Sequence, residues 1–421
     1  MKRIFSFLSI MVFAGMASLN AQIQIDAEYR PRMIIDNGYK NIKKPDDPVL
    51  VSISQRTRLN VGFRAPKLET YLSVQDVRFW GDDDNYSSSG MLGNTKSLSV
   101  HQAWFALKPL NTISFKIGRQ QFNYDDQRIL AQRSWNDYQV TYDAILFAYQ
   151  AEKQKLDVAL SWNTSGMKND LFPAAKMKMF DFIRYEYTLG DLSLSALSAV
   201  TGFPKSDTLS DLKLTGTSNL GIVYKHANWD ARFYGYYQYH LNTHNEKIDA
   251  YMFSFWLKRK MMDGKLLAGL GLDFYSGEDG TSNDPDYRSV NHSFNPFYGI
   301  SHGRNGYMDL YAATPEQGLQ DWMLKAEYYP NPDIRLQLDF HHFRNVEHQL
   351  ATDGLSVLDK SMGSELDFTL YYKIIDAVTL QAGYSFYVTT PAFERYKKYS
   401  GETNPFLQFG YVMCVVKPRL L

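Results

Sequence analysis

The chain has 421 residues, its 45 lysines and arginines are balanced by 45 aspartates and glutamates, and 44% of its residues are hydrophobic. A formal net charge of zero gives no general case for binding nucleic acid or an anionic membrane surface. The single cysteine, Cys414, excludes an intrachain disulfide and a cluster of thiolate metal ligands. We therefore expect no nucleic-acid partner, no bound metal and no cofactor.

The first residues have the three-part pattern of a secretory signal peptide. Lys2 and Arg3 supply positive charge, residues 4–14 are apolar, and residues 17–21 form a small, weakly polar stretch. We expect cleavage after Ala21. The alternative is an uncleaved membrane anchor, which the short apolar segment disfavours because a spanning helix needs about 20 apolar residues.

Apolar and polar residues alternate through the remaining chain, and residues 229–241 show this clearly. Successive side chains of a β-strand point to opposite faces, so each such segment has one apolar and one polar face. A membrane barrel presents the first face to lipid and the second to a polar lumen. A soluble sandwich also alternates, so the pattern alone does not separate the two. Further examples are 51–63, 156–163, 334–341 and 365–372.

The lengths of the connections between these segments favour the membrane barrel. Long and short connections alternate almost strictly, as expected when short turns face the periplasm and longer loops face the outside. The short connection at 243–246 is the exception, since its position calls for a long loop. The long connections are 36–48, 81–96, 123–138, 165–177, 204–211, 277–317, 346–361 and 391–403, and the other short ones are 66–67, 109–111, 152–154, 190–191, 262–264 and 331–333.

The sequence therefore predicts an all-β fold, a transmembrane antiparallel β-barrel of about 18 strands in a Gram-negative-type outer membrane. Residues 22–421 form this one domain behind the signal peptide, residues 1–21. No later apolar run is long enough for a spanning helix, and lipid then permits only a closed barrel. The expected partners are the lipid bilayer and the barrel-assembly machinery. Aromatic residues near the predicted strand ends fit girdles at the two membrane interfaces, and the alternative is that they belong to an ordinary aromatic core. These residues are Tyr234, Tyr236, Tyr237, Tyr328, Tyr329, Tyr371 and Tyr372.

Several segments resemble the alginate-export family of outer-membrane barrels. Gly118-Arg119-Gln120 ends a strand and is followed by Trp135-Asn136-Asp137, which is similar to a strand-to-loop segment of that family. Nearer the C-terminus, residues 338–344 and residues 362–367 resemble two further strand segments. The resemblance implies an eighteen-stranded channel with an electropositive constriction that passes an acidic polysaccharide.

Charged residues of both signs fall on the predicted lumen face. Opposite charges stand two residues apart at Arg184 and Glu186 and at Asp230 and Arg232, which indicates a ladder of mixed charge. Arginine offers a fixed fork of donors that matches a carboxylate, so inward arginines are candidates for solute contact. The alternative is that they pair with inward carboxylates and brace the wall. The pore-lining candidates are Arg56, Arg58, Lys116, Arg119, Arg128, Arg133, Arg184, Arg232, Arg335, Asp339, Glu365 and Asp367.

Two of these candidates depend on the fold of a loop. Arg128 and Arg133 follow the Gly118-Arg119-Gln120 strand, and they reach the pore only if their loop turns inward. Acidic residues at 82–85 and 277–286 raise the possibility of Ca²⁺ binding, a cation that takes oxygen ligands. Solvated loop charge is the commoner explanation.

The leading functional hypothesis is a channel that passes a hydrophilic oligo- or polysaccharide, anionic ones included, by passive diffusion. The alternatives are a porin for small nutrients, a barrel enzyme and an adhesive barrel. The sequence has no Gly-x-Ser-x-Gly elbow, no His-Glu-x-x-His segment and no phosphate-binding glycine loop, so we expect no enzyme activity.

Overall fold

The structure is a computed structural model that describes residues 21–81, 98–163, 177–205, 211–242, 244, 246–297, 299–300, 302–399 and 401–421. Residues 1–20 of the predicted signal peptide and the acidic segment 82–85 lie outside these ranges. The first strand begins at Gln22, directly after the predicted cleavage position.

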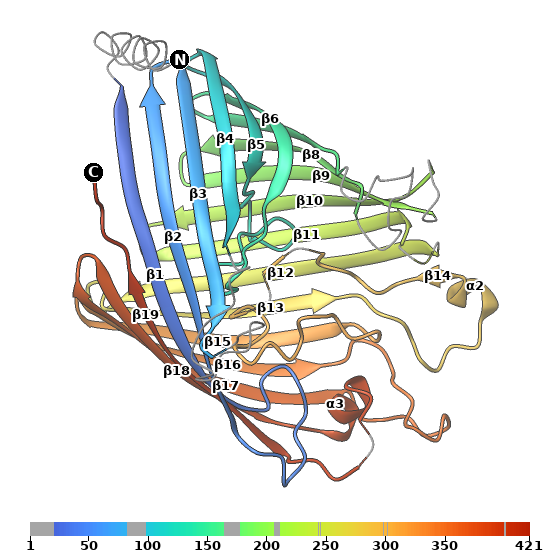
Figure 1. Cartoon of the computed structure of the whole chain (residues 1–421). Coiled ribbons are helices and arrows are strands. Elements are labelled where there is room, and N and C mark those ends of the chain that lie inside the picture. Colours follow the sequence, from blue (N-terminus) through green and yellow to red (C-terminus); the bar gives the residue numbers. More distant parts are fainter. Residues whose placement is uncertain are drawn as a thin grey trace.

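Long antiparallel strands make up most of the described chain and wind around one barrel (Figure 1). They are β1 (Gln22–Asn37), β2 (Leu50–Ala65), β3 (Leu68–Phe79), β4 (Leu98–Leu110), β5 (Ile113–Gln120), β6 (Tyr142–Gln150), β7 (Gln154–Ser161), β8 (Met179–Leu189), β9 (Leu192–Pro204), β10 (Leu212–His226), β11 (Trp229–Leu241), β12 (Lys247–Met261), β13 (Leu266–Tyr275), β15 (Leu319–Asn331), β16 (Ile334–Arg344), β17 (Ser361–Ile375), β18 (Val378–Val388) and β19 (Phe406–Val416).

The barrel is closed, because β1 pairs with both β2 and β19 and every other long strand has two antiparallel neighbours. The two-residue strand β14 (Val290–Asn291) stands outside this ring and pairs in parallel with β12, while β13 pairs directly with β15. Eighteen strands therefore form the wall in the described part of the chain, which confirms the predicted fold. Closure satisfies all strand edges, as a lipid environment requires.

The alternation of the sequence becomes the two faces of the wall. Leu160, Leu220 and Leu324 are examples of apolar side chains on the outer face, each more than half exposed, whereas Ser254 and Asp339 on the inner face are fully buried. An apolar exterior around a polar interior is the reverse of a soluble protein and suits a barrel in lipid. No helix in the described residues is both long enough and apolar enough to cross a membrane.

Several aromatic residues differ from the girdle prediction, and Tyr371 is one of them because it lines a cavity in the lumen. Tyr234 and Tyr236 point into the barrel and are each 5% exposed, and the Tyr236 hydroxyl donates a hydrogen bond to Asp126 of a loop. Tyr237 points outward and is 46% exposed, as a girdle residue should be. The run of tyrosines alternates faces like every other strand residue, so only every second one can lie at the interface.

The connections at the two ends of the barrel differ in length. Short turns such as that between β2 and β3 lie at the end where β1 begins, and the longer loops lie at the other end. Two short helices, α2 (Pro285–Arg288) and α3 (Pro391–Tyr396), lie at the long-loop end, away from both chain ends (Figure 1). In outer-membrane barrels the long-loop end faces the cell exterior.

Two of the long connections turn into the lumen. We call residues 121–141 the first inward loop and residues 276–318 the second inward loop. Phe122, Leu130, Met308 and Leu310 of these loops are at most 1% exposed, although they lie outside the strands. The main apolar core of the molecule is therefore formed where the loops pack against the inner face of the wall, not between layers of a sandwich.

Candidate pore constriction

The two inward loops are joined to each other inside the barrel. The amide nitrogen of Ile300 donates to the carbonyl oxygen of Gln127 over 3.0 Å. Arg133 donates to the carbonyl oxygens of Gly299 and Phe297, each over 2.9 Å. Because side chain and backbone both bridge the loops, the pair acts as one crossing structure in the lumen.

The inward loops are anchored to an acidic wall, which we define as Asp273, Asp321, Asp339, Glu365 and Asp367 on β13, β15, β16 and β17. Arg128 of the first inward loop lies 2.5 Å from Asp273, and both side chains are at most 1% exposed. Glu365 accepts hydrogen bonds from the backbone amides of Tyr307 and Met308, over 2.5 and 2.9 Å. The contact of Arg128 with Asp273 is charge-assisted, and such bonds are among the stronger ones in proteins.

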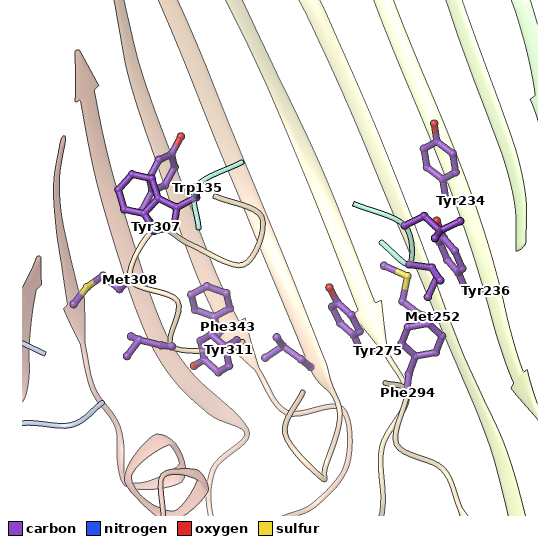
Figure 2. Packing of buried hydrophobic residues seen from close by; sticks show 14 of the residues in the cluster. Trp135, Tyr234, Tyr236, Met252, Tyr275, Phe294, Tyr307, Met308, Tyr311 and Phe343 are labelled. Atoms are coloured by element: carbon purple, nitrogen blue, oxygen red, sulfur yellow. The ribbon is translucent and has the colours of Figure 1, made fainter. Parts of the chain in front are cut away.

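Aromatic packing adds to this anchorage. Trp135 of the first inward loop stacks on His302 of the second, with ring centroids 3.7 Å apart. Tyr311 packs on Phe343 of β16, with centroids 4.3 Å apart. Figure 2 shows the loop residues Trp135 and Tyr307 beside each other, and Tyr311 of the second inward loop beside Phe343 of β16. The contacts hold the loops within the barrel.

Asp309 fixes the second inward loop to its neighbours. It accepts a hydrogen bond from the Tyr39 hydroxyl over 2.6 Å and from His302 Nδ1 over 3.1 Å. Burial alone raises the pKa of the Asp309 carboxyl, but His302 and these hydrogen bonds lower it further than burial raises it. The net pKa of Asp309 lies below its ordinary value of 3.8, so the loop is held by a carboxylate at neutral pH.

Beyond β18 and β19 along the barrel wall lies an arginine wall, which we define as Arg30 and Arg32 of β1 with Arg56 and Arg58 of β2. Each of the four residues is at most 8% exposed. Alternation places the members of each strand on one face, and the register sets Arg30 directly opposite Arg56. Like charges directly opposite destabilise a sheet, so this arrangement needs anions nearby.

Two carboxylates meet part of that need. Asp137 of the first inward loop binds Arg30 and Arg32 over 2.7 and 2.8 Å. Glu28 lies 2.5 Å from Arg56. Arg58 instead donates to neutral side-chain amides, to Gln75 over 2.9 and 2.7 Å and to Gln139 over 2.7 Å. The wall thus carries four guanidinium groups against two carboxylates, and Arg58 hydrogen-bonds to neutral groups.

A cavity of about 520 Å³ borders the arginine wall. Both inward loops and strands from β1 to β4 and β17 to β19 contribute to its lining, so it spans the narrow part of the lumen. Its lining includes three of the four wall arginines with polar and aromatic neighbours: Arg30, Arg56, Arg58, Ser73, His101, Gln139, Trp135 and Tyr371. A polar cavity with several cations suits a hydrated anionic group.

The predicted candidates fall into three places. Arg56 and Arg58 line the cavity, and Arg128 and Arg133 are brought inside because their loop turns inward. Lys116, Arg184, Arg232 and Arg335 belong to the inner face and are engaged by neighbours: Lys116 lies over the Trp104 ring, Arg184 pairs with Asp125 and Glu186, Arg232 with Asp230 and Arg335 with Glu327. Asp339, Glu365 and Asp367 belong to the acidic wall.

Arg119 lies elsewhere. It is 43% exposed and pairs over 2.8 Å with Asp143, which is 62% exposed, on the outer face of β5 and β6. Gln120 is the residue of that strand end that points inward and is fully buried. Since neighbouring residues point to opposite faces, Arg119 does not line the cavity.

Sequence reasoning missed Arg30 and Arg32. The signal was present, because Glu28, Arg30 and Arg32 are spaced two residues apart between the apolar Ala27 and Met33. Their partner Asp137 lies more than 100 positions away in the chain, and no local pattern announces that contact.

The acidic segment at 277–286 is used in loop structure. Asp279 accepts hydrogen bonds from the Thr281 amide and hydroxyl, over 2.8 and 2.6 Å. Its carboxylate also approaches Glu347 and His348, with ligand atoms of the three within 4.8 Å of one another. Asp284 caps the short helix α2.

Comparison with known proteins agrees with this description. The model of the alginate export family matches residues 32–188, which run from β1 to β8. No curated protein matches the sequence. The segments at 338–344 and 362–367 lie outside the matched range.

Solved structures share the fold over nearly the whole chain. Pseudomonas aeruginosa OccK11 (OpdR) has a TM-score of 0.63 at 12% identity, with 95% of this chain and 96% of that chain covered. P. aeruginosa OpdL has a TM-score of 0.63 at 12% identity, with 96% and 99% covered. Acinetobacter baumannii OccAB3 has a TM-score of 0.61 at 11% identity, with 95% and 100% covered.

The closed barrel with its apolar exterior and constricted polar lumen defines an outer-membrane channel. The fold and the family match are those of porin-type channels, and the outer membrane is the location they support. The predicted resemblance to the alginate-export family is confirmed over residues 32–188, the range that the family model matches.

Proposed function

We propose that the channel passes small hydrophilic anions by passive diffusion, with the arginine wall contacting a carboxylate of the solute. The single observation that carries this proposal is the excess of guanidinium groups on the arginine wall, four against two carboxylates, with three of the four bordering the cavity. A guanidinium presents a planar fork of donors that matches a carboxylate in two parallel hydrogen bonds.

Arg58 is the residue we assign to first contact. A guanidinium has five N–H donors, and three hydrogen bonds from Arg58 to side chains are made, all to neutral amides. Amide partners position the group without neutralising it. Arg56, by contrast, is paired with Glu28, and its charge is partly offset.

The joined inward loops favour a small solute over a polysaccharide chain. A polymer would have to thread past a crossing that is bridged by Arg133 and by the Ile300 amide, and pinned to Asp273 by Arg128. A solute that fits a cavity of about 520 Å³ needs no such opening. Among the other solved structures that share the fold, one is of P. aeruginosa OpdK with vanillate, an aromatic carboxylate, which supports this choice of solute class. Passage of an acidic polysaccharide is therefore the second candidate, favoured by the family match.

The barrel-assembly machinery stays the expected partner for insertion.

Ion selectivity in a planar bilayer tests the proposal. We expect the refolded wild-type protein to prefer anions, measured as the reversal potential in a salt gradient. Arg58→Gln removes one charge close to the path. A unit charge about 4 Å away is worth about 1 kcal/mol at the dielectric constant of water, so the permeability ratio should fall about fivefold.

Arg119→Gln is the matched control, since it makes the same chemical change on the outer face. It should leave the permeability ratio unchanged. A wild-type channel that prefers cations, or equal ratios for the two variants, would overturn the assignment of Arg58. Conductance blocked by an oligoguluronate but not by benzoate would favour the polysaccharide candidate instead.

A further inference from the structure

A second pocket, with both polar and apolar lining, lies at the long-loop end of the barrel, away from the arginine wall. Its volume is about 420 Å³, within the roughly 300–1,000 Å³ of small-molecule pockets. The ends of β10 to β12 form one side and the second inward loop forms the other. The residues that matter below are Gln238, Asn291, Asn295, Thr314 and Glu316.

The loop side of this pocket is held firmly to the wall. The Gln238 side chain is 1% exposed and binds the backbone of Asn295 at both ends, donating to its carbonyl over 2.7 Å and accepting from its amide over 2.8 Å. Ser293 donates to the carbonyl of Glu316 over 2.7 Å. Parallel pairing of β14 with β12 sets Asn291 beside Ile248. A pocket held in place before binding loses less entropy when a ligand enters.

Two amide donors point to a polar ligand. The Oδ1 atom of Asn291 accepts from the Ser293 amide over 3.1 Å, and that of Asn295 accepts from the Phe297 amide over 2.9 Å. In each asparagine the side-chain oxygen therefore accepts a hydrogen bond from the loop backbone, and the Nδ2 donors are available to other partners. Within the described residues, no hydrogen bond links either Nδ2 group to the protein.

The same pocket supplies acceptors and an apolar surface. The Thr314 hydroxyl and the Glu316 carboxylate line it, and neither side chain has a hydrogen-bond partner in the part of the chain that the structure describes. Pro296 and Phe297 add apolar area. No arginine or lysine belongs to the described lining, so the pocket lacks the cations that an acidic ligand needs.

We propose that this pocket binds an uncharged, hydroxyl-rich ring, that is, a neutral saccharide unit, at the outer mouth of the channel. Amide donors and a carboxylate acceptor pair with hydroxyl groups, each of which both donates and accepts, and the C–H faces of the ring lie on the apolar residues. The proposal goes beyond the proposed function, because it concerns a separate site of opposite electrostatic character.

Calorimetric titration of the refolded, detergent-solubilised protein with maltotriose tests it. We expect saturable binding to the wild type. Asn295→Asp keeps the acceptor for the Phe297 amide and removes the Nδ2 donors, and it should weaken binding about tenfold. Ala313→Phe places a ring on an exposed loop position of the lining and should abolish binding by filling the pocket.

Asn404→Asp is the matched control. Asn404 accepts from the Phe406 amide over 3.0 Å, the same local hydrogen bond as in Asn295, but it lies outside the pocket. It should bind maltotriose like the wild type. Absence of saturable binding to the wild type, or unchanged binding in both Asn295→Asp and Ala313→Phe, would overturn the pocket assignment. Anion selectivity is measured separately with Arg58→Gln, so failure of the saccharide-pocket proposal would not contradict the proposed function, and failure of the proposed function would not contradict the pocket.

Discussion

Two regions of the lumen wall carry opposite charges and are used differently. All five carboxyl groups of the acidic wall are at most 1% exposed, and the inward loops bind two of them, Asp273 and Glu365. Arg128 binds Asp273, Lys325 lies 3.0 Å from Asp339, and backbone amides bind Glu365. The arginine wall is also largely buried, but three of its members border a cavity of about 520 Å³. The acidic wall holds the loops at Asp273 and Glu365. The arginine wall also binds the first inward loop, through Asp137, but it borders the cavity as well and can meet a solute there.

This difference explains why a mixture of charges in the sequence need not give a mixed lumen. Alternation predicts that side chains of both charges lie on the inner face, but it does not predict which of these charges will be paired with groups of the loops. The loops take up carboxylates in one region, and in the other they bring Asp137 to only two of the four arginines. A net positive patch remains where the cavity lies.

The largest expected effect comes from breaking the anchor on the acidic wall. Arg128→Ala leaves Asp273 buried without the guanidinium that lies 2.5 Å away. Removing one partner of a buried pair costs about 3–5 kcal/mol. We expect a lower unfolding midpoint in detergent and larger, noisier single-channel currents, because the first inward loop is released.

The double variant Arg128→Met with Asp273→Asn shows how much of the lost stability comes from losing the ion pair and how much comes from leaving the Asp273 charge buried without a partner. Replacing both partners should recover most of the stability that the single variant loses. Equal stability of Arg128→Ala and the wild type would show that the acidic wall does not anchor the loop.

A smaller effect is expected from acid at the second inward loop. The pKa of Asp309 lies below 3.8 in the folded protein, so its contribution to stability is present above that pH and is lost as pH falls through the folded pKa. Hydrogen bonds to a charged group contribute about 1.5–3 kcal/mol. We expect current noise to rise below about pH 3.8, the ordinary pKa.

Asp309→Asn provides the comparison. It should show the noise already at neutral pH and little further change in acid. A wild-type channel with identical noise at pH 3 and pH 7 would contradict a role of Asp309 in holding the loop.

The barrel was predictable because every strand repeats one rule, whereas the constriction depends on contacts between distant segments. The alternation of strand side chains correctly predicted that Arg56 and Arg58 point inward. Applied from the inward Lys116, the same alternation predicts that Arg119 points outward. Arg119 was selected through a family resemblance that carries no information on side-chain direction. The contact of Arg128 with Asp273 joins residues 145 positions apart, and no periodicity encodes it.

On the arginine wall, removal of a carboxylate should strengthen anion preference. Glu28→Gln keeps a polar side chain near Arg56 and removes the charge that lies 2.5 Å away. By the same Coulomb estimate as for Arg58, the anion-to-cation permeability ratio should rise about fivefold. Reversal potentials that shift toward cations, or not at all, would mean that Glu28 lies off the conduction path.

The smallest effect is expected on the outside of the barrel, at the pair of Arg119 and Asp143. Both side chains are well exposed, and they lie near the long-loop end of β5, where the wall meets the membrane interface. Exposed ion pairs contribute about 0–1 kcal/mol. A double-mutant cycle with Arg119→Ala and Asp143→Ala, followed by unfolding in detergent, should therefore give a coupling energy below about 1 kcal/mol. A coupling of several kcal/mol would mean that this pair is as important as the buried pair of Arg128 and Asp273, and the contrast between inner anchors and outer charges would fail.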